Sequence, residues 1–390
     1  MRGFEMILST FICLVIVFFY PYVIFPVGLV FLQKIIKKSE SLGNGKWEGE
    51  LPEVSLIVSA YNEEKVIQEK IENALCSKYP SAKLQIIVAS DGSTDGTADI
   101  ARSYSQAGVV LMHSDTRRGK NACLNAAVGM AKGQIIAFTD ANAMFDDMAI
   151  QYLVDGFDSE KVGCVVGKER RSAKKNDGTS KSDGVYWRFE NWIKEALNRF
   201  GLVIVGNGPI LAVRRELFRP LSNDVANDFE TPMQIGNSGW RVIFQDKALS
   251  FENSATKAQE EYRRKTRIVV RGLTGFSRNF SDLRGARFFV FVSHKVIRWF
   301  GAFLQFAILV LSLLILDEHP WFASVALGAQ FIFYLLAAAG AVNLFGVRKS
   351  KYVAIPFYFC MVNLAAAVAI CRFTLGVRVS VWEKAASVRQ

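Results

Sequence analysis

Three short apolar runs of the sequence are each followed by polar residues that could bind a nucleotide or a metal ion. The first run ends in Ala60-Tyr61-Asn62-Glu63-Glu64, the second leads into Ser90-Asp91-Gly92-Ser93, and the third leads into Asp140-Ala141-Asn142. Acidic and amide oxygens at positions 140 and 142 suit a divalent cation held against a diphosphate. Each element alone is a weak signal, because Asp, Gly and Ser also favour turns and helix caps.

The elements that must position these residues are strands and helices in alternation. The runs at 54–61, 84–89, 109–113 and 134–139 are short and rich in β-branched residues, and helical patterns at 95–106 and 121–132 separate them. This alternation predicts an α/β domain with a mostly parallel sheet and helices on both faces. Because ligands of such sheets bind beyond the carboxyl ends of the strands, we expect the three polar elements to meet at one edge.

The order and spacing of the three elements resemble the nucleotide-sugar domain of family 2 inverting glycosyltransferases, the membrane-bound group that includes the cellulose, hyaluronan and poly-N-acetylglucosamine synthases. The resemblance covers about residues 54–271 and implies a GT-A type fold. It implies that the strand ends hold the nucleoside and phosphates of a UDP-sugar. The matching donor-binding residues are Ala60, Tyr61, Glu63, Asp91 and Lys120.

The resemblance also implies a divalent cation, Mn²⁺ or Mg²⁺, at the donor site. Asp140 matches the first acid of the family's Asp-x-Asp metal motif, and Asn142 stands where the second acid is expected. Asn can still offer an oxygen to a metal ion, but the site loses one charge. We therefore predict metal ligands at Asp140 and Asn142, with a lower affinity than two carboxylates would give.

The acceptor side of the resemblance supplies the candidate catalytic base. Asn227-Asp228-Phe229-Glu230 resembles an acidic element whose final Asp removes the proton of the acceptor hydroxyl, which implies this role for Asp228. An inverting transfer needs one such carboxylate, because the acceptor oxygen attacks the anomeric carbon opposite the departing nucleotide. Glu230 is the internal competitor, and a solvated acidic turn is the alternative. Gly206, Asn207 and Gly208 resemble the acceptor-side loop, although Gly residues could simply shape a turn.

Processive members of the family carry a Gln-x-x-Arg-Trp motif, which this chain matches only at Arg267. The guanidinium of Arg267 could bind the donor diphosphate through its planar fork of donors. The missing Gln and Trp argue against the synthesis of long chains. For Arg263 and Arg264, a basic helix face lying on lipid headgroups is an equally good interpretation.

The composition requires a membrane, because hydrophobic residues make up 51% of the chain and concentrate at 6–33, 301–316, 321–345 and 352–375. The segment 6–32 carries no charge and is long enough to span a hydrocarbon core of about 30 Å. Lys34, Lys37 and Lys38 follow it, which by the positive-inside rule places the soluble region in the cytoplasm. A secretory signal peptide would carry its basic residues before the apolar run.

The charges near the C-terminus make the last apolar segment ambiguous. The link at 317–320 reads Asp-Glu-His-Pro and is expected outside. A full crossing by 352–375 would then put Arg378, Lys384 and Arg389 outside, so this segment could instead be re-entrant or lie on the surface. His294, beside basic residues and Trp299, is expected at the membrane interface.

The remaining features exclude other classes of protein. The net charge of +11 suits anionic lipids and an anionic donor, because the basic clusters adjoin membrane segments, and nucleic-acid binding is not expected. Six cysteines lack CxxC pairs and metal spacing, so we expect buried thiols without zinc or disulfides. Too few spans and no internal repeat argue against an ordinary transporter.

The sequence thus predicts a multi-pass inner-membrane enzyme that transfers a sugar from a UDP-sugar to an acceptor hydroxyl in polysaccharide or glycolipid synthesis, with its catalytic domain in the cytoplasm. Alternatives are transfer to a polyprenyl phosphate or other lipid, and a non-catalytic component of polysaccharide assembly or export. The acceptor is a saccharide or a lipid-linked molecule, and polysaccharide-assembly proteins are possible partners. The expected division is an anchor at 1–38, a GT-A domain at 50–253, interfacial helices at 254–300, membrane helices at 301–376 and a tail at 377–390.

Overall fold

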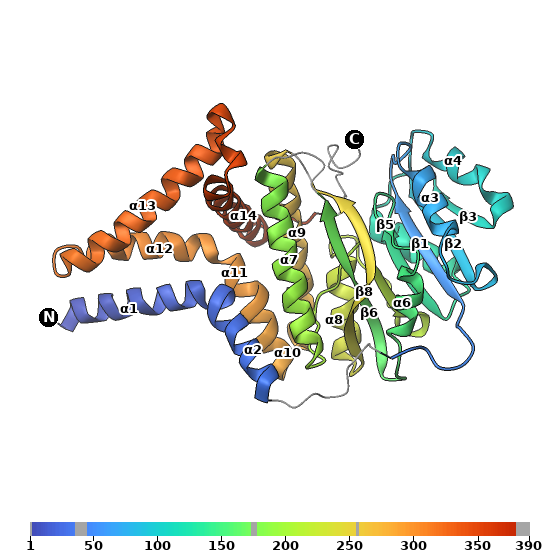
Figure 1. The fold of residues 1–390 in the computed structure, drawn as a ribbon, viewed down its shortest axis with the longest axis horizontal. Coiled ribbons are helices and arrows are strands. Elements are labelled where there is room, and N and C mark those ends of the chain that lie inside the picture. Colours follow the sequence, from blue (N-terminus) through green and yellow to red (C-terminus); the bar gives the residue numbers. More distant parts are fainter. Residues whose placement is uncertain (1, 36–44, 173–177, 255–256, 380–390) are drawn as a thin grey trace.

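A computed structural model describes residues 2–35, 45–172, 178–254 and 257–379. In this part of the chain, eight strands form one mixed sheet in the order β3-β2-β1-β4-β7-β6-β8-β5 (Figure 1). In sheet order the strands are β3 (Val109–Ser114), β2 (Leu84–Asp91), β1 (Val54–Ala60), β4 (Ile135–Asp140), β7 (Leu211–Arg214), β6 (Val162–Ser172), β8 (Arg241–Asn253) and β5 (Met144–Phe145).

The four strands predicted from sequence lie side by side and are parallel, with β1 in the middle. Every residue of β1 is buried, as its continuous apolar run requires for a strand covered on both faces. The pairing register sets Ser59 opposite Asp140 and Ala60 opposite Ser90. The polar elements therefore start at the same edge of the sheet. β7 runs antiparallel to β4 and β6, and β5 runs antiparallel to β8, so the sheet is mixed but mostly parallel, as predicted.

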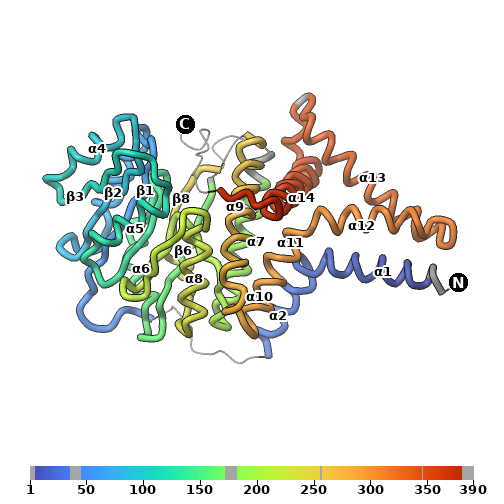
Figure 2. The backbone as a smooth tube through the Cα atoms, turned by 180° about the vertical axis from the view of Figure 1, so that it is seen from behind, coloured from blue at the N-terminus to red at the C-terminus, as the bar shows by residue number. Residues whose placement is uncertain are grey.

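Helices cover both faces of this sheet. Apolar residues of α3 (Ile67–Leu75), α4 (Thr97–Ser103) and α6 (Ala149–Asp155) belong to one buried cluster with the strands. Residues of α5 (Lys120–Met130) and α8 (Asn227–Asn237) belong to a second cluster. Figure 2 shows α5 and α8 on the same side, seen from behind. The predicted layered α/β architecture is confirmed.

Two long helices, α7 (Gly178–Asn198) and α9 (Ala258–Asn279), stand between the sheet and the apolar helices of both chain ends (Figure 1). A third buried cluster joins the sheet domain, α7, α9 and the apolar helices. In it, Phe229 of α8 contacts Phe291 from the C-terminal part of the chain. Phe229 and Phe291 meet edge to face with ring centroids 5.4 Å apart. The α/β domain and the apolar helices therefore pack directly against each other.

Apolar helices from the two ends of the chain lie next to each other. From the N-terminal end come α1 (Arg2–Phe19), a π-helical turn (Tyr20–Ile24) and α2 (Phe25–Ile35). From the C-terminal end come α10 (Gly285–Phe291), a π-helical turn (Val292–Val296), α11 (Ile297–Trp299), α12 (Gly301–Leu314), α13 (Pro320–Val342) and α14 (Lys351–Thr374). In the described chain three helices are long and apolar enough to span a membrane, or four if the bent pair 285–299 and 301–314 counts as one span.

The directions of these helices differ from a simple set of spans. α1, α12 and α13 project away from the sheet, whereas α2 and α10 run along the domain and α14 crosses the base of the projecting helices (Figure 1). The span predicted at 6–32 lies within one apolar helical segment, Glu5–Ile35, that is long enough to cross a membrane. The chain changes direction within it, near a π-helical turn that contains Pro21, which cannot donate a backbone hydrogen bond (Figure 1). Only the α1 part points away from the domain.

Three expectations about single side chains need correction. His294 does not face lipid headgroups, because it is 5% exposed and its Nε2 lies 3.2 Å from Glu190. Cys123 and Cys164 are buried thiols as expected, but Cys13, Cys76 and Cys371 are exposed. Arg264 lies in a buried ionic cluster, not on a lipid-facing surface. The C-terminal tail from 380 and the anchor residues 36–38 lie outside the described residues.

Candidate active site

The loops after β1 and β2 are tied together by side-chain hydrogen bonds. Asn62, in the left-handed conformation with φ 51°, accepts a 2.7 Å bond from the backbone N–H of Thr94, while its own backbone N–H donates to Ser93. Gly92 has φ 65°, and a Cβ there would come 2.6 Å from backbone atoms of Thr116 and Arg117. Only glycine fits such a close backbone approach at positive φ. The turn-forming residues of the sequence therefore join the loops after β1 and β2 at this edge of the sheet.

Asp91 organises the loop that leads to Lys120. Its carboxylate is 5% exposed and accepts hydrogen bonds from the backbone N–H groups of Arg118, at 2.8 Å, and of Gly119, at 3.0 Å. The predicted nucleoside contact by Asp91 remains a prediction, since the carboxylate already holds this loop. Gly119 directly precedes α5, so the N–H groups of the first turn of that helix open beside Lys120.

Tyr61, Ala60 and Glu63 lie at the same edge. The Arg117 guanidinium sits 3.9 Å from the centre of the Tyr61 ring, which gives the site a cation over an aromatic face. Ala60 is buried at the end of β1, and Glu63 is 1% exposed with its backbone N–H bonded to Thr97. These predicted donor residues are brought together, and their contacts with a nucleotide remain predictions.

Asp140 and Lys120 form an ion pair at the end of β4. Asp140 Oδ1 also accepts a 2.8 Å hydrogen bond from the Ser59 hydroxyl, and both charged side chains are 15% exposed. Two residues further on, the Nδ2 of Asn142 donates a 2.7 Å hydrogen bond to Oε1 of Glu252 on β8. The predicted metal ligands therefore lie on one turn. The ammonium of Lys120 contacts Asp140, and the carboxylate of Glu252 contacts Asn142.

A buried lysine beneath this turn was missed from sequence. Lys70 of α3 is 0% exposed, its ammonium donates to the carbonyl oxygen of Ala143, and it lies 4.0 Å from the centre of the Phe145 ring. Burial lowers the pKa of Lys70 to about 7, although the charge of Asp140 opposes the change. The available signal was a lysine at a core position of the helical pattern that includes Ile67 and Ile71.

The donor set fits a divalent cation only in part. Among the described residues, no group of three His, Cys, Asp or Glu side chains surrounds a common point. A cation that is also held by the phosphates of a bound nucleotide needs few protein ligands. Because Nδ2 makes the bond to Glu252, the Oδ1 of Asn142 faces away from that carboxylate and can serve as a neutral oxygen ligand.

Asp228 and Glu230 have different surroundings on α8. Asp228 is partly exposed and faces the Gly206–Gly208 loop, where a Cβ on Gly208 would lie 3.6 Å from Oδ2 of Asp228. Glu230 is 6% exposed and accepts hydrogen bonds from Gln234 at 2.9 Å and from Asn279 at 3.1 Å. Burial raises the pKa of Glu230. Of the two candidate bases, only Asp228 combines exposure with the acceptor-side loop.

The loop at 206–208 is held from below by Lys194 of α7. The Lys194 ammonium is buried and donates to the carbonyl of Gly206, at 3.0 Å, and to the side-chain oxygen of Asn207. Asn207 is fully buried, and its amide nitrogen donates to the carbonyl of Gly167. The Asn207 side chain therefore shapes the loop, and the predicted acceptor-side role of residues 206–208 remains a prediction. Gly206 is buried as well: its N–H donates to the carbonyl of Asp228 at 2.6 Å, and its carbonyl accepts from Lys194. Gly208 is the partly exposed residue of this loop.

The donor loop and the segment before Asp228 are joined by hydrogen bonds. Asn121 Nδ2 donates to the carbonyls of Ser222 and Val225, and Asn223 Nδ2 donates to the carbonyl of Arg118 at 2.8 Å. Arg271 of α9 braces the same segment from the other side through the carbonyls of Asn223 and Val225. These bonds join residues as far as 105 positions apart in the chain.

Arg267 lies one helical turn before Arg271 on α9 and is partly exposed. Its predicted contact with the donor diphosphate remains a prediction. Burial lowers the pKa of Arg271, while the charge of Asp228 opposes this, so a second guanidinium lies within electrostatic range of the candidate base. Arg271 was not singled out from sequence, although its spacing from Arg267 places both on related faces of one helix.

A buried ionic network connects the domain with α14. Arg171 of β6 and Arg264 of α9 both pair with Asp183, at 3.4 and 3.1 Å, and Arg264 also pairs with Glu261 at 2.7 Å. The hydroxyl of Tyr358 on α14 lies 3.0 Å from an oxygen of each acid, Asp183 and Glu261. An apolar helix is therefore fixed to the domain by polar contacts.

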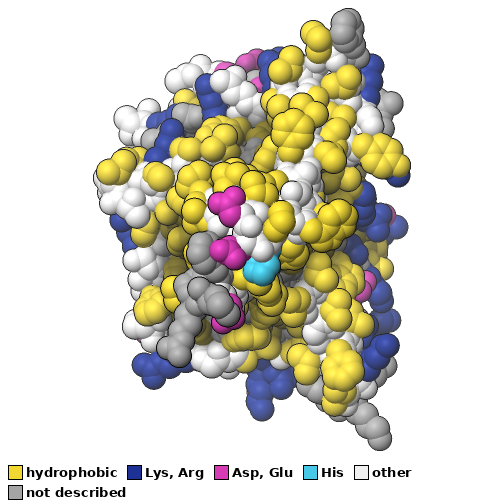
Figure 3. Space-filling model, turned by 90° about the vertical axis from the view of Figure 1, so that its left-hand side faces the viewer, with side chains coloured by type: hydrophobic (Ala, Val, Ile, Leu, Met, Phe, Trp, Pro, Cys, Tyr) yellow, Lys and Arg dark blue, Asp and Glu magenta, His cyan; other side chains and the backbone are white. Residues whose placement is uncertain are grey.

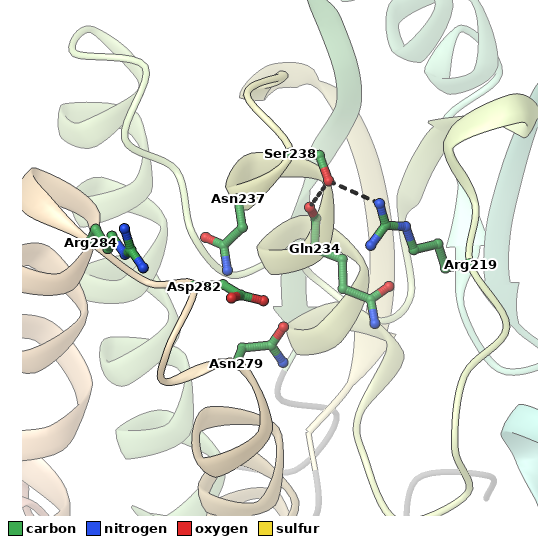
Figure 4. Close-up of a pocket in the computed structure, with 7 residues that line it drawn as sticks. All are labelled: Arg219, Gln234, Asn237, Ser238, Asn279, Asp282 and Arg284. Carbon is green, nitrogen blue, oxygen red and sulfur yellow. Dashed lines mark hydrogen bonds between the residues drawn. The ribbon is translucent and has the colours of Figure 1, made fainter.

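A polar cavity of about 310 Å³ lies at the far end of α8 from Asp228 (Figure 4). None of the predicted site residues lines it. Gln234 and Asn279, which bind Glu230, belong to its wall, so Glu230 is connected with this cavity through its two amide partners. The lining side chains are Arg219, Gln234, Asn237, Ser238, Asn279, Asp282 and Arg284.

The sheet order and the polar edge at the ends of β1, β2 and β4 define a GT-A type nucleotide-sugar domain. A mannosyltransferase from Pyrobaculum calidifontis, solved with GDP-Man and Mn²⁺, has the same fold, with a TM-score of 0.70 at 21% identity over 95% of this chain and 99% of that chain. The model of glycosyl transferase family 2 matches residues 55–221. Residues 55–221 therefore match the family 2 glycosyltransferase domain that the resemblance implied.

Three curated relatives illustrate the range of this family. A probable glycosyltransferase, YdaM, of Bacillus subtilis is 28% identical over 283 residues, which cover 68% of this chain and 67% of the relative. The β-monoglucosyldiacylglycerol synthase of a Nostoc species is 32% identical over 176 residues, which cover 43% of this chain and only 37% of that enzyme. A poly-β-1,6-N-acetyl-D-glucosamine synthase of Staphylococcus epidermidis is 29% identical over 119 residues, which cover 30% of this chain and 28% of that enzyme.

Proposed function

We propose that this protein is an inverting glycosyltransferase that moves a sugar from a UDP-sugar to an acceptor hydroxyl at the cytoplasmic face of a membrane, in polysaccharide or glycolipid synthesis. One observation carries the proposal. The loop at 118–122, which follows the donor-side strands, is hydrogen-bonded to the segment at 222–225, which leads directly to Asp228. These bonds hold the predicted donor-phosphate loop beside the segment that leads to the predicted base, which supports a single displacement.

Each charged group then has a role in the transfer. Asp228 takes the proton from the acceptor hydroxyl as that oxygen attacks the anomeric carbon, while the nucleoside diphosphate leaves on the opposite face. Lys120, at the start of α5, and the guanidinium of Arg117 offset the negative charge of the diphosphate. A bound Mn²⁺ or Mg²⁺, held by Asp140 and the oxygen of Asn142, would add Lewis-acid stabilisation of the leaving group.

A lipid acceptor is the favoured alternative to a saccharide, because the candidate base lies on a helix that packs against the membrane-proximal elements. The ring of Phe229, the residue after Asp228, contacts the ring of Phe291. The Phe291 ring in turn packs against Trp299, with ring centroids 5.8 Å apart. A lipid-linked hydroxyl or phosphate held at the interface would need little displacement to reach this end of α8. The relative that makes a glucosyl diacylglycerol supports the same class of acceptor.

The exposed faces of the apolar helices support a membrane arrangement for the protein. Hydrophobic side chains cover the end of the molecule from which α1, α12 and α13 project, and Lys and Arg side chains lie mostly at its rim (Figure 3). Phe306 of α12 and Phe331 of α13 are each 68% exposed, as lipid-facing residues would be. We propose that α1 and α13 cross the inner membrane, with the domain at 50–253 and the interfacial helices at 254–300 on the cytoplasmic side. The 14 residues of α12 are too few for a crossing by themselves, so we propose that α12 completes the third crossing with the residues that flank it.

In this topology α14 lies along the membrane surface and does not cross. Tyr358 carries its hydroxyl to two buried acids of the domain, and α14 runs across the projecting helices in Figure 1. Such a helix leaves Arg348, Lys349 and Arg378 on the cytoplasmic side, which satisfies the positive-inside rule that a fourth crossing would violate. A reporter that is active only in the cytoplasm should therefore be active when it is fused after Gln390. A reporter that is active only outside should be inactive at the same position.

The function is tested by nucleotide release from a panel of UDP- and GDP-sugars, with detergent-solubilised protein, Mn²⁺ and both lipid and oligosaccharide acceptors. Asp228→Asn should lower kcat by about 100-fold to 10,000-fold while the donor KM changes little, because the lost group acts as a base. Glu230→Gln is the matched control and should retain most activity, since Glu230 is engaged by Gln234 and Asn279. Equal loss in both variants would move the base away from Asp228.

A further inference from the structure

The second position of the metal motif and Glu252 form a pair that crosses the sheet. Asn142 follows β4, while Glu252 lies near the end of β8, 110 residues later in the chain. Asn142 Nδ2 donates to Glu252 Oε1 at 2.7 Å. A carboxylate can only accept, so the amide nitrogen must face Glu252 and the amide oxygen must face elsewhere. The orientation of Asn142 is therefore dictated by its partner.

Glu252 is itself fixed in place. Its second oxygen accepts a 3.0 Å bond from the guanidinium of Arg171, which is 5% exposed and also pairs with Glu169 at 2.5 Å. The Glu252 side chain is 13% exposed, so little water is available to replace either bond. Asn142 Nδ2 donates to one oxygen of Glu252 and Arg171 donates to the other, so both oxygens of this carboxyl group are engaged.

We propose that Glu252 is a positioning residue that turns the Asn142 oxygen toward the donor phosphates and their cation. In this pair the acid of the metal motif stands at position 252 and a neutral amide stands at position 142. The negative charge expected at position 142 resides at position 252, and the neutral amide stands between it and the ligand. This inference rests on the proposed function for its effect on the donor, but the pairing itself can be tested without donor or metal.

The pair makes an unusual prediction about restoring the family motif. Asn142→Asp would recreate Asp-x-Asp, which in isolation should strengthen a metal site. In this chain it would set two carboxylates in hydrogen-bonding contact beside a buried guanidinium, which is repulsive. The variant should therefore be less stable and bind Mn²⁺ more weakly. Glu252→Gln in the same chain should rescue it, because the glutamine amide can donate to the new carboxylate while its oxygen still accepts from Arg171.

The experiment compares four full-length proteins in detergent: wild type, Asn142→Asp, Glu252→Gln and the double variant. The first measurement is thermal unfolding in EDTA without donor. The second is the Mn²⁺ dependence of donor turnover, together with Mn²⁺ binding followed by electron paramagnetic resonance. A fifth protein, Asn142→Asp with Glu169→Gln, is the control, because Glu169 shares Arg171 but is not hydrogen-bonded to position 142.

We expect Asn142→Asp to lower Tm and to weaken Mn²⁺ binding by about tenfold, the lower end of the loss on removing an orienting partner. The double variant should regain most of both, and the control with Glu169→Gln should regain little. Asn142→Asp that matches or exceeds wild type, or equal rescue by both glutamines, would overturn the pairing. If Tm is rescued but none of the proteins binds Mn²⁺, both the positioning role and the proposed metal are overturned. The pair then has a structural role alone.

Discussion

Lys70→Met should make the protein more stable and less active, with a stability gain that depends on pH. The Lys70 ammonium has no exposed surface, and its hydrogen bond to the carbonyl of Ala143 is made beneath the turn that carries Asp140. Methionine has a similar length and no charge, so it fills the same space without the cost of a buried ammonium. Loss of the hydrogen bond should loosen the turn and raise the donor KM severalfold.

The magnitude follows from the pKa of Lys70, which burial lowers from 10.5 to about 7. Because the folded-state pKa lies below the unfolded value, the folded protein binds fewer protons between pH 7 and 10.5, and its free energy of unfolding rises with pH across that window. The slope is about 1.4 kcal/mol for each pH unit, so the full difference is on the order of 5 kcal/mol. Below pH 7 the entire cost is present, and above pH 10.5 it is gone.

Thermal unfolding of wild type and Lys70→Met in EDTA, at intervals from pH 7 to 9.5, tests this reasoning. Lys70→Met should melt higher at pH 7, and the difference should shrink by about 5 °C or more by pH 9.5. Lys65→Met is the control, since Lys65 is exposed just before the same helix and should give no such change. A variant that melts below wild type at pH 7, or a difference that does not vary with pH, would refute the argument.

Three further variants test how the site and the membrane helices are held. Tyr358→Phe should lower stability by about 1.5–3 kcal/mol, the cost of a hydrogen bond to a charged group, and Tyr352→Phe on the same helix, 70% exposed, should not; equal effects on Tm would contradict the docking of α14 through Tyr358. Gly92→Ala should abolish donor binding or folding, because its Cβ would meet the backbone at 2.6 Å, whereas Gly108→Ala, with φ 84° but open space, should cost only about 1–2 kcal/mol; similar melting of both would mean that the loop is not tightly packed. Lys194→Met should raise the acceptor KM more than it lowers kcat, and Lys194→Arg should restore part of it, since Lys194 holds the carbonyl of Gly206; a pure loss of kcat would indicate a role nearer the reacting atoms.

The fold of the sheet could be predicted because its strands are specified locally. The run at 54–61 is apolar throughout most of its length, which fits a strand buried on both faces, and β1 is buried along its length. That holds for β1, β2, β3 and β4, whereas β5, β6, β7 and β8 were not predicted. β7 has four residues, and β5 has two, so neither leaves a periodic signal.

The candidate site was predicted in its parts but not in its connections. The polar residues at strand ends follow from the parallel order of β1, β2 and β4, which brings Ser59 opposite Asp140. The sequence does not reveal that Asn207 points into the core, because this depends on the packing of other elements against the loop. The burial of Lys70 is indicated only by its helical spacing from Ile67 and Ile71, which does not show what packs against it.

What the sequence by itself determined is the class of domain, the positions of its candidate donor residues and the need for a membrane, because hydrophobic runs, turn residues and charge all act over short distances along the chain. The tertiary structure alone decided which carboxylate of α8 is exposed, which side of the Asn142 amide faces Glu252, and that α14 is fixed to the domain through Tyr358. These are contacts between residues tens to hundreds of positions apart, and only the folded chain brings them within hydrogen-bonding distance.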